Sequence, residues 1–225
     1  MNRESLKILP KARHLLQRMR SSISSHDQPY IDPISELLQG GWAIGEDDVE
    51  IIEREVERYL QCAHISILEF GSGASTLVFL RYLVSHSLPG DITSVECDPQ
   101  WINRVESCAS KILANKQGSV KLSIVAGEYN EQSGLICPSI ENGEDLSKKY
   151  DIIFIDSPPD NIVEDGRLKL SSRITKLLDK RGTLLIHDTS RSMELYAFKK
   201  LSSYYLDAEL CYTGKGMGIL RFPTG

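Results

Sequence analysis

Short apolar runs alternate along this chain with longer segments in which apolar residues recur every three or four positions. The short runs are typical of strands buried on both faces of a sheet, and the longer segments are typical of amphipathic helices. The pattern predicts strands at residues 65–70, 91–96, 120–125, 150–155 and 182–186. It predicts helices at residues 46–60, 77–84, 167–178 and 192–206, and one that begins at Asp98-Pro99.

The last part of the chain has a different pattern. Residues 208–213 and 217–222 flank Gly214-Lys215-Gly216, which is a hairpin signature. Strands that alternate with helices indicate a mostly parallel sheet with helices on both faces. We therefore predict a Rossmann-like α/β domain at residues 45–225, ending in an antiparallel hairpin, after an N-terminal helical extension and linker at residues 1–44.

The first predicted strand runs into a glycine-rich turn. Gly71 and Gly73 permit tight backbone angles and a close approach of a ligand, and Ser75 and Thr76 offer hydroxyl groups where the next helix begins. The free N–H groups of that helix end favour a carboxylate or a phosphate. Thr76 stands where the third glycine of a dinucleotide-binding fingerprint would fall, which disfavours a pyrophosphate ligand.

Polar residues that could act in a site stand at the carboxyl ends of three other predicted strands, at the same edge of the sheet. Glu96 ends the second strand and is placed to accept hydrogen bonds from ribose hydroxyls. Asp156 follows the fourth strand, and His187 and Asp188 follow the fifth. Because neighbouring strands lie about 4.8 Å apart, we expect Asp156 and Asp188 to face one another.

The composition of the chain argues against several classes of protein. The chain has 225 residues, a formal charge of -5 and 25% charged residues, which is ordinary for one soluble domain and argues against a general nucleic-acid binder. Its five scattered cysteines suit reduced thiols in the cytoplasm. No apolar run is long enough to span a membrane, and the basic N-terminus lacks the apolar core of a signal peptide. That basic segment is a candidate contact for an anionic substrate or for a second copy in a homo-oligomer.

The stretch Glu69-Phe70-Gly71-Ser72-Gly73 resembles the first motif of class I S-adenosylmethionine-dependent methyltransferases. The resemblance implies that S-adenosylmethionine is the cofactor and that Glu69 acts near its sulfonium or ammonium, directly or through water. It further implies that residues after the third strand lie beside the adenine, and Trp101 is a second candidate there. The cofactor-binding residues expected on this basis are Glu69, Gly71, Ser72, Gly73, Ser75, Thr76, Glu96, Cys97, Gly127, Glu128 and Asp156.

Two further resemblances concern the methyl acceptor. Asp156 and Asp188 match two metal-binding aspartates of catechol-type O-methyltransferases, but Thr189 replaces the expected asparagine, so the dependence on a divalent metal is left open. The runs FIDSPPDNIVEDGRL and LLIHDTSRSMELYA are similar to segments of glucuronoxylan O-methyltransferases. That similarity implies a sugar or other hydroxylated acceptor, with Ser157, Arg167 and Arg191 as substrate-binding residues. Arg167 and Arg191 either clamp an anionic group or form salt bridges with Asp165 and Glu194.

The sequence thus predicts a methyltransferase that modifies a hydroxyl group on a small molecule or saccharide. Asp156, His187 and Asp188 are the candidate catalytic residues. His187 is the candidate general base, because an unperturbed histidine titrates near neutrality, although it can equally be a structural residue. The alternatives are methylation of nitrogen or carbon, a non-catalytic cofactor-binding subunit and, more remotely, a nicotinamide-dependent oxidoreductase.

Overall fold

The computed structural model describes residues 34, 37, 44–114, 119–141, 148–159, 161–205 and 207–222. The predicted N-terminal extension, residues 1–44, lies outside the described residues except for Ile34, Leu37 and Ile44. The boundary at residue 45 therefore stays a prediction. No helix in the described part of the chain has both the length and the apolar character needed to cross a bilayer.

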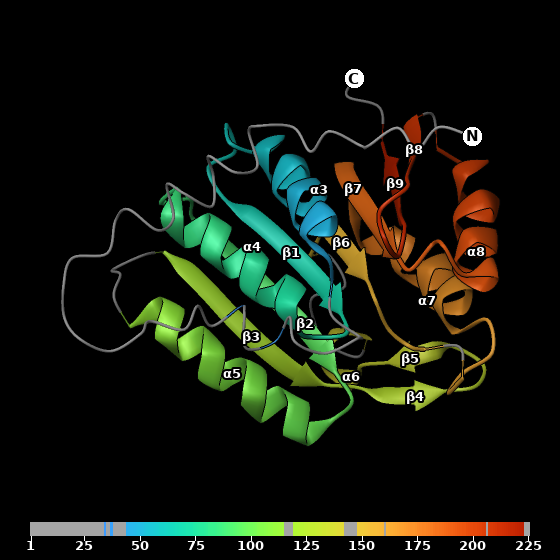
Figure 1. Cartoon of the computed structure of the whole chain (residues 1–225), viewed down its shortest axis with the longest axis horizontal. Coiled ribbons are helices and arrows are strands. Elements are labelled where there is room, and N and C mark those ends of the chain that lie inside the picture. Colours follow the sequence, from blue (N-terminus) through green and yellow to red (C-terminus); the bar gives the residue numbers. More distant parts are fainter. Residues whose placement is uncertain are drawn as a thin grey trace, which may run out of the picture. The chain divides into compact units, whose positions relative to one another are not determined.

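A seven-stranded sheet forms the centre of the described chain, in the order β3-β2-β1-β6-β7-β9-β8 (Figure 1). The first five strands in that order are parallel, and β9 runs antiparallel to both β7 and β8. The predicted Rossmann-like sheet with a C-terminal antiparallel hairpin is therefore confirmed. The strands are β1 (Ile65–Phe70), β2 (Gly90–Glu96), β3 (Val120–Ala126), β6 (Tyr150–Ile155), β7 (Leu178–His187), β8 (Asp207–Cys211) and β9 (Met217–Arg221).

Helices cover both faces of this sheet. Along β6, Ile152 and Phe154 join the core beneath one group of helices, whereas Ile153 and Ile155 join the core on the opposite face. This alternation follows from the two-residue period of a strand, and it explains why the run is apolar throughout. One face carries α3 (Glu46–Glu57), α4 (Ala74–Ser85) and α5 (Pro99–Leu113), and the other carries α7 (Gly166–Ile174) and α8 (Ser192–Ser202).

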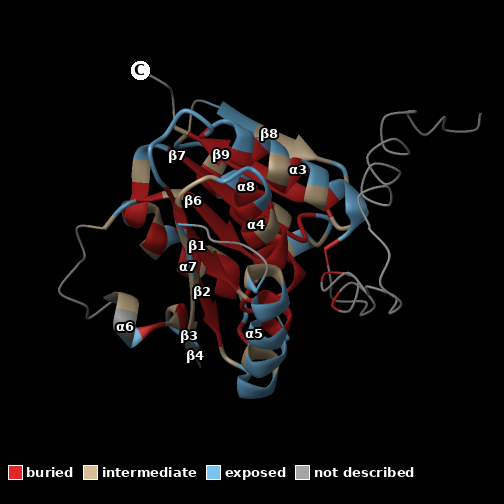
Figure 2. Ribbon diagram, turned by 90° about the vertical axis from the view of Figure 1, so that its left-hand side faces the viewer, coloured by how far each residue is buried: buried red, intermediate tan, exposed pale blue. Residues whose placement is uncertain are grey.

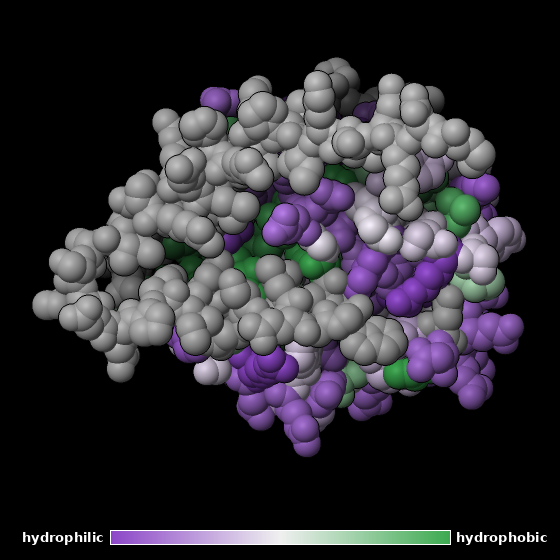
Figure 3. All heavy atoms as spheres, viewed as in Figure 1, coloured by the Kyte–Doolittle hydropathy of each residue, from purple (hydrophilic) through white to green (hydrophobic). Residues whose placement is uncertain are grey.

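Burial follows the same layering. Buried residues gather in the strands and on the helix sides that face them, whereas α5 turns exposed residues outward (Figure 2). On the face drawn in Figure 3, hydrophilic side chains dominate the visible described surface and hydrophobic ones show in small areas between them. The sheet is thus a packed core, and polar chemistry is confined to its edges.

Several segments differ from the sequence predictions. The fifth strand begins at Leu178 rather than Gly182, because Tyr150 of β6 pairs with Leu178 across an irregularity in the register. The helix expected at residues 167–178 accordingly ends at Ile174 and continues as a short 3-10 turn, Thr175–Leu177. The polar stretch after β3 contains a small hairpin, β4 (Glu128–Asn130) and β5 (Gly134–Ile136), followed by α6 (Pro138–Glu141).

Candidate functional site

A cavity of about 480 Å³ opens at the carboxyl ends of β1, β2, β6 and β7. Loops diverge at this edge of an open α/β sheet, which is where such folds bind ligands. Nine of the predicted site residues line the cavity: Gly71, Ser72, Ser75, Glu96, Asp156, Ser157, Arg167, Asp188 and Arg191. The wall also contains Trp101, the second candidate beside the adenine, and residues absent from the predicted site, namely Leu37, Ile44, Ala74, Arg104, Tyr129 and Pro159.

The glycine turn after β1 is shaped by close packing against the exit of β6. Gly71 has a φ of +95°, and a Cβ atom there would lie 3.0 Å from the Cβ of Ser157. Its N–H donates to the Val95 carbonyl of β2 at 2.8 Å. A side chain at Gly71 would therefore strain the backbone and push two loops apart.

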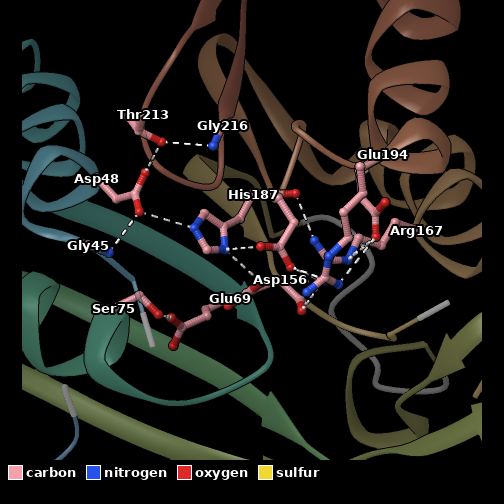
Figure 4. A network of polar contacts seen from close by, with 12 residues as sticks. Gly45, Asp48, Glu69, Ser75, Asp156, Arg167, His187, Glu194, Thr213 and Gly216 are labelled. Carbon is pink, nitrogen blue, oxygen red and sulfur yellow. Dashed lines mark hydrogen bonds and ion pairs between the residues drawn. The ribbon is translucent and has the colours of Figure 1, made fainter. Parts of the chain in front are cut away.

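Glu69 lies beneath this turn rather than in the cavity. Its carboxylate accepts a hydrogen bond from Ser75 Oγ at 2.5 Å (Figure 4). It also accepts from Thr76 Oγ1 at 2.5 Å and Ser94 Oγ at 2.6 Å. Burial raises the pKa of Glu69 to about 7, although the three hydroxyl groups oppose the shift. The Glu69 carboxylate is therefore not among the groups that line the cavity, and its action on the cofactor, directly or through water, stays a prediction. The side chain is fully buried, and it holds the turn and the start of α4.

Glu96 faces the cavity at the end of β2. Its Oε1 atom accepts from the backbone N–H groups of Cys97 and Asp98 at 2.7 and 3.0 Å. Its Oε2 atom accepts from the N–H and the hydroxyl of Ser72, at 3.0 and 3.2 Å. The carboxylate thus ties the glycine turn to the loop after β2, and the rotatable Ser72 hydroxyl is the contact that a ligand hydroxyl can replace.

Trp101 and Arg104 form one wall near Glu96. Pro99 and the Asp98 side chain begin α5, since Asp98 Oδ1 accepts from the N–H groups of Gln100 and Trp101 at 2.9 and 3.4 Å. This cap places Trp101 so that its indole N–H donates to the Ser72 carbonyl. The Arg104 guanidinium lies 5.1 Å from the centre of the Trp101 ring. The result is a flat aromatic surface beside the turn.

Five other predicted cofactor residues do not line the cavity: Gly73, Thr76, Cys97, Gly127 and Glu128. Gly127 is needed for packing, because a Cβ there would lie 2.6 Å from Val95 Cγ1. Glu128 is exposed on β4. Burial raises the pKa of the Cys97 thiol to about 12. Direct contacts of these five residues with the cofactor stay predictions, and Tyr129, next to Glu128 in the chain, lines the cavity.

The other end of the cavity is built from charged groups at the ends of β6 and β7. Asp156, His187 and Asp188 offer atoms that all lie within 4.8 Å of one another, so the two aspartates meet as predicted. Asp188 has a φ of +61°, which is unusual for a residue other than glycine. Its neighbour Thr189 donates its N–H to the Gly216 carbonyl of the β8–β9 turn at 3.1 Å. The hairpin therefore supports this loop.

His187 is fully buried and lies between two carboxylates. Its Nδ1 atom is 2.9 Å from Asp156 Oδ1, and its Nε2 atom is 3.3 Å from Asp48 Oδ2 of α3 (Figure 4). Burial disfavours the charged imidazolium, but the carboxylates outweigh that effect and raise the pKa of His187 to about 9. A protonated ring without access to the cavity cannot take a proton from a substrate, which corrects the prediction of a general base.

Asp48 is the partner that sequence reasoning missed. Besides His187, its carboxylate accepts from the Gly45 N–H at 2.8 Å and from Thr213 Oγ1 at 2.6 Å. Burial raises its pKa, but hydrogen bonds from His187, Thr213 and Gly45 leave the pKa below the ordinary value. In the sequence Asp48 is one of three acidic residues at a helix start, and nothing in the sequence connects it with a histidine 139 positions away.

Arg167 and Arg191 differ in their exposure. The Arg167 side chain is 3% exposed and forms ion pairs with Asp156, Asp188 and Glu194, so of the two predicted salt-bridge partners Glu194 is present and Asp165 is not. The Arg191 side chain is 40% exposed at the cavity, with Nη1 3.1 Å from Asp188 Oδ2. Only Arg191 is therefore placed to reach an acceptor molecule.

The residues at this end do not fit a divalent metal ion. Arg167 Nη2 lies 3.3 Å from Asp156 Oδ1 and 3.1 Å from Asp188 Oδ2, between the two carboxylates that would hold the ion. Both ring nitrogens of His187 face carboxylates, which accept hydrogen bonds and leave no nitrogen lone pair for a metal. The guanidinium and the imidazolium already pair with both aspartates that would hold the ion.

Comparisons with known proteins agree with this architecture. The model of a family described as a methyltransferase domain matches residues 68–189. A search of curated proteins found no match. Among solved structures, the SAH-bound methyltransferase PaMTH1 of Podospora anserina is 17% identical, with a TM-score of 0.54 and coverage of 99% of this chain and 100% of that one.

Two O-methyltransferase structures are also similar. TomG of Streptomyces achromogenes, involved in tomaymycin synthesis and solved with SAM, is 12% identical with a TM-score of 0.61, covering 96% of this chain and 100% of that one. The O-methyltransferase of Bacillus cereus, solved with SAH, is 16% identical with a TM-score of 0.60, covering 92% and 97%. At these identities the likeness establishes a shared fold.

Proposed function

Because this chain belongs to the methyltransferase-domain family and has the fold of class I S-adenosylmethionine-dependent methyltransferases, we propose that it methylates a hydroxyl oxygen of a small-molecule or saccharide acceptor. The observation that carries the proposal is the single cavity that joins Glu96 and the glycine turn to Asp156 and Asp188. One end of it suits an adenosyl cofactor, and the other end suits a polar acceptor.

The cofactor end would hold S-adenosylmethionine through the Glu96 carboxylate and the Trp101 ring. The ribose hydroxyls replace the Ser72 hydroxyl at Glu96 Oε2, where the present contact of 3.2 Å is the longest of the four. The adenine packs beside Trp101, whose ring is fixed by its hydrogen bond to the Ser72 carbonyl. Together these contacts fix the cofactor so that its methyl group points toward the ends of β6 and β7.

The acceptor end would orient the hydroxyl and receive its proton. Methyl transfer forms the oxygen–carbon bond as the carbon–sulfur bond breaks, the bonding pair returns to the sulfur, and the hydroxyl proton leaves. Asp156 and Asp188 line the cavity and are hydrogen-bond acceptors for that hydroxyl, whereas Arg191 holds a polar or anionic group elsewhere on the acceptor. Positioning and exclusion of water do most of the remaining work.

Support for oxygen as the target comes from the neighbours of similar fold, since TomG and the Bacillus cereus protein are O-methyltransferases. The saccharide acceptor and the domain boundary at residue 45 are part of the same proposal. The saccharide rests on the motif around Asp156, Arg167 and Asp188, all three of which line the cavity, with Arg191 as the exposed cation beside them.

A turnover screen tests the proposal. The full chain is incubated with methyl-labelled S-adenosylmethionine and separate sets of saccharides, phenols, carboxylic acids and amines, and the products are identified by mass spectrometry. We expect label on the oxygen of a hydroxylated acceptor. Label found solely on nitrogen or carbon would contradict O-methylation, and tight binding of S-adenosylhomocysteine without transfer to any set would favour a non-catalytic subunit.

A further inference from the structure

A buried guanidinium group stands between the two aspartates at the acceptor end of the cavity. Arg167 Nη2 is 3.1 Å from Asp188 Oδ2 and 3.3 Å from Asp156 Oδ1, while Asp156 and Asp188 come from the exits of two neighbouring parallel strands. A single guanidinium nitrogen therefore bridges the two carboxylates at the acceptor end of the cavity.

Backbone carbonyls hold the guanidinium in this position. Nη1 donates to the His187 carbonyl at 2.7 Å, Nη2 to the Asp156 carbonyl at 2.8 Å, and Nε to the Pro158 carbonyl at 3.3 Å. The acceptors lie on the loops that follow β6 and β7, so the group is fixed by both strand exits at once (Figure 4). A planar group with several donors is suited to such a junction, whereas a lysine has one point charge.

The chain is built to bring Arg167 to this place. It is the second residue of α7, and the first residue, Gly166, packs so closely that a Cβ there would lie 2.4 Å from Pro158 Cγ. The helix start is thus pressed against the loop after β6. With 3% of its side chain exposed, Arg167 has little freedom to leave the two aspartates.

A divalent ion needs the space that this guanidinium fills. Carboxylate oxygens hold such ions at about 2.0–2.6 Å, so an ion bridging Asp156 and Asp188 would lie next to Nη2 and repel it. The third candidate ligand, His187, directs Nδ1 to Asp156 and Nε2 to Asp48 rather than into the site. Binding an ion would require Arg167 to move away from three carbonyls and two carboxylates.

We propose that Arg167 is a fixed internal cation that takes the place of a divalent metal ion, so that this protein positions Asp156 and Asp188 and transfers methyl groups without a metal. The statement about methyl transfer rests on the proposed function, whereas the exclusion of a metal ion does not depend on it. A guanidinium offers no coordination sites, so hydrogen bonds rather than chelation hold the acceptor hydroxyl, and an acceptor with two adjacent hydroxyls gains no special advantage.

Metal titration tests the proposal without any knowledge of the acceptor. Mn²⁺ is titrated into the full chain, with binding followed by calorimetry and by electron paramagnetic resonance. The proteins compared are the wild type, the single variants Arg167→Ala, Arg167→Lys and Asp188→Asn, and the double variant Arg167→Ala with Asp188→Asn. S-adenosylhomocysteine binding measured in parallel shows which variants keep the folded cofactor site. Transfer activity with and without a chelator is measured once an acceptor is known.

We expect no Mn²⁺ bound at this site in the wild type or in Arg167→Lys. We expect Arg167→Ala to gain one Mn²⁺ per chain, because Asp156 and Asp188 become a metal site once the guanidinium no longer lies between them. Adding Asp188→Asn should abolish this binding, because it removes one of the two carboxylates. A merely structural arginine would not produce this gain. Mn²⁺ binding by the wild type that disappears in Asp188→Asn would overturn the proposal, as would a folded Arg167→Ala that binds none.

If Arg167→Ala loses its fold, the wild type and Asp188→Asn still decide the question, because the wild type must show no Mn²⁺ binding that depends on Asp188. Chelator-sensitive transfer by the wild type would also overturn the proposal. Failure of the proposed function has a different signature, since a protein that binds no S-adenosylhomocysteine or transfers no methyl group can still show the gain of Mn²⁺ in Arg167→Ala.

Discussion

The two ends of the cavity are built in opposite ways. At the cofactor end, Glu69 and Glu96 are satisfied by backbone N–H groups and hydroxyls that lie within about 25 positions of them in the sequence. At the acceptor end, charged side chains neutralise one another, and partners such as Asp48 and His187 come from segments 139 positions apart. The cofactor end is thus built from residues close together in the sequence, and the acceptor end is built from residues far apart in it.

This difference assigns different tasks to the two ends. Backbone N–H groups and hydroxyls around the glycine turn hold its carboxylates and fix the shape of a site for one cofactor. The charges at the acceptor end are stabilising only when every partner is present, since a buried charge that loses its partner is costly. Changes at the acceptor end should therefore affect stability first, and changes at the cofactor end should affect binding first.

The largest expected effect is on stability, at His187. His187→Gln leaves Asp48 and Asp156 without the imidazolium between them, and we expect the free energy of unfolding to fall by about 3–5 kcal/mol, as for other broken buried ion pairs. Denaturant unfolding near pH 7 measures the loss. The matched control is His64→Gln, which replaces an exposed histidine. A comparable fall in the free energy of unfolding for His64→Gln would contradict the claim that the effect comes from the buried charges around His187.

The same variant has a predicted dependence on pH. The folded-state pKa of His187, about 9, lies above the ordinary 6.5, so the folded protein binds this proton more tightly than the unfolded chain does. The stabilisation is complete below pH 6.5 and is lost as the pH rises through about 9. We expect the stability difference between wild type and His187→Gln to shrink over that range, and a constant difference would contradict the charged imidazolium.

A smaller effect is expected at the glycine turn. Gly71→Ala forces a side chain into a φ of +95° and against Ser157, at a cost of about 1–3 kcal/mol for such strain. Unfolding experiments and calorimetry with S-adenosylhomocysteine should show both lower stability and weaker binding. Gly214→Ala is the control, because a Cβ there meets nothing within 4 Å. If Gly71→Ala and Gly214→Ala changed stability and S-adenosylhomocysteine affinity equally, the claim that the turn at Gly71 has no room for a side chain would be wrong.

The smallest effect is expected at Trp101. Trp101→Phe keeps the aromatic surface and removes the N–H that donates to the Ser72 carbonyl, a loss of about 1 kcal/mol for a neutral hydrogen bond. We expect S-adenosylhomocysteine affinity to fall by less than about tenfold with little change in stability. Replacement by Ala should weaken binding further, and identical affinities for Phe and Ala would argue against stacking on this ring.

The same contrast explains what the sequence could predict. The order of strands and helices followed from runs such as residues 150–155, and the glycine turn and Glu96 followed from local spacing. Local spacing cannot tell which way a side chain points: Glu69 is fully buried under the turn and Glu128 is exposed to solvent, whereas Glu96 faces the cavity.

The acceptor end was less predictable because its chemistry depends on neighbours that are distant in the sequence. His187 alone looks like a base titrating near neutrality, and only the positions of Asp48 and Asp156 make it a buried cation. Arg167 likewise looks like a substrate clamp until its contacts with three carbonyls are known. The strand exits were predictable, whereas the charge balance between them was not.

The central claim is that Glu96 and the turn beside it bind the adenosyl cofactor. Calorimetric titration of S-adenosylhomocysteine into the wild type, Glu96→Gln and Glu128→Gln tests it directly, since both variants remove one carboxylate and only Glu96 lines the cavity. We predict that Glu96→Gln weakens binding by roughly 10- to 100-fold, corresponding to about 1.5–3 kcal/mol for a charged hydrogen-bonding group, and that Glu128→Gln binds as the wild type does. Wild-type affinity in Glu96→Gln would contradict the account.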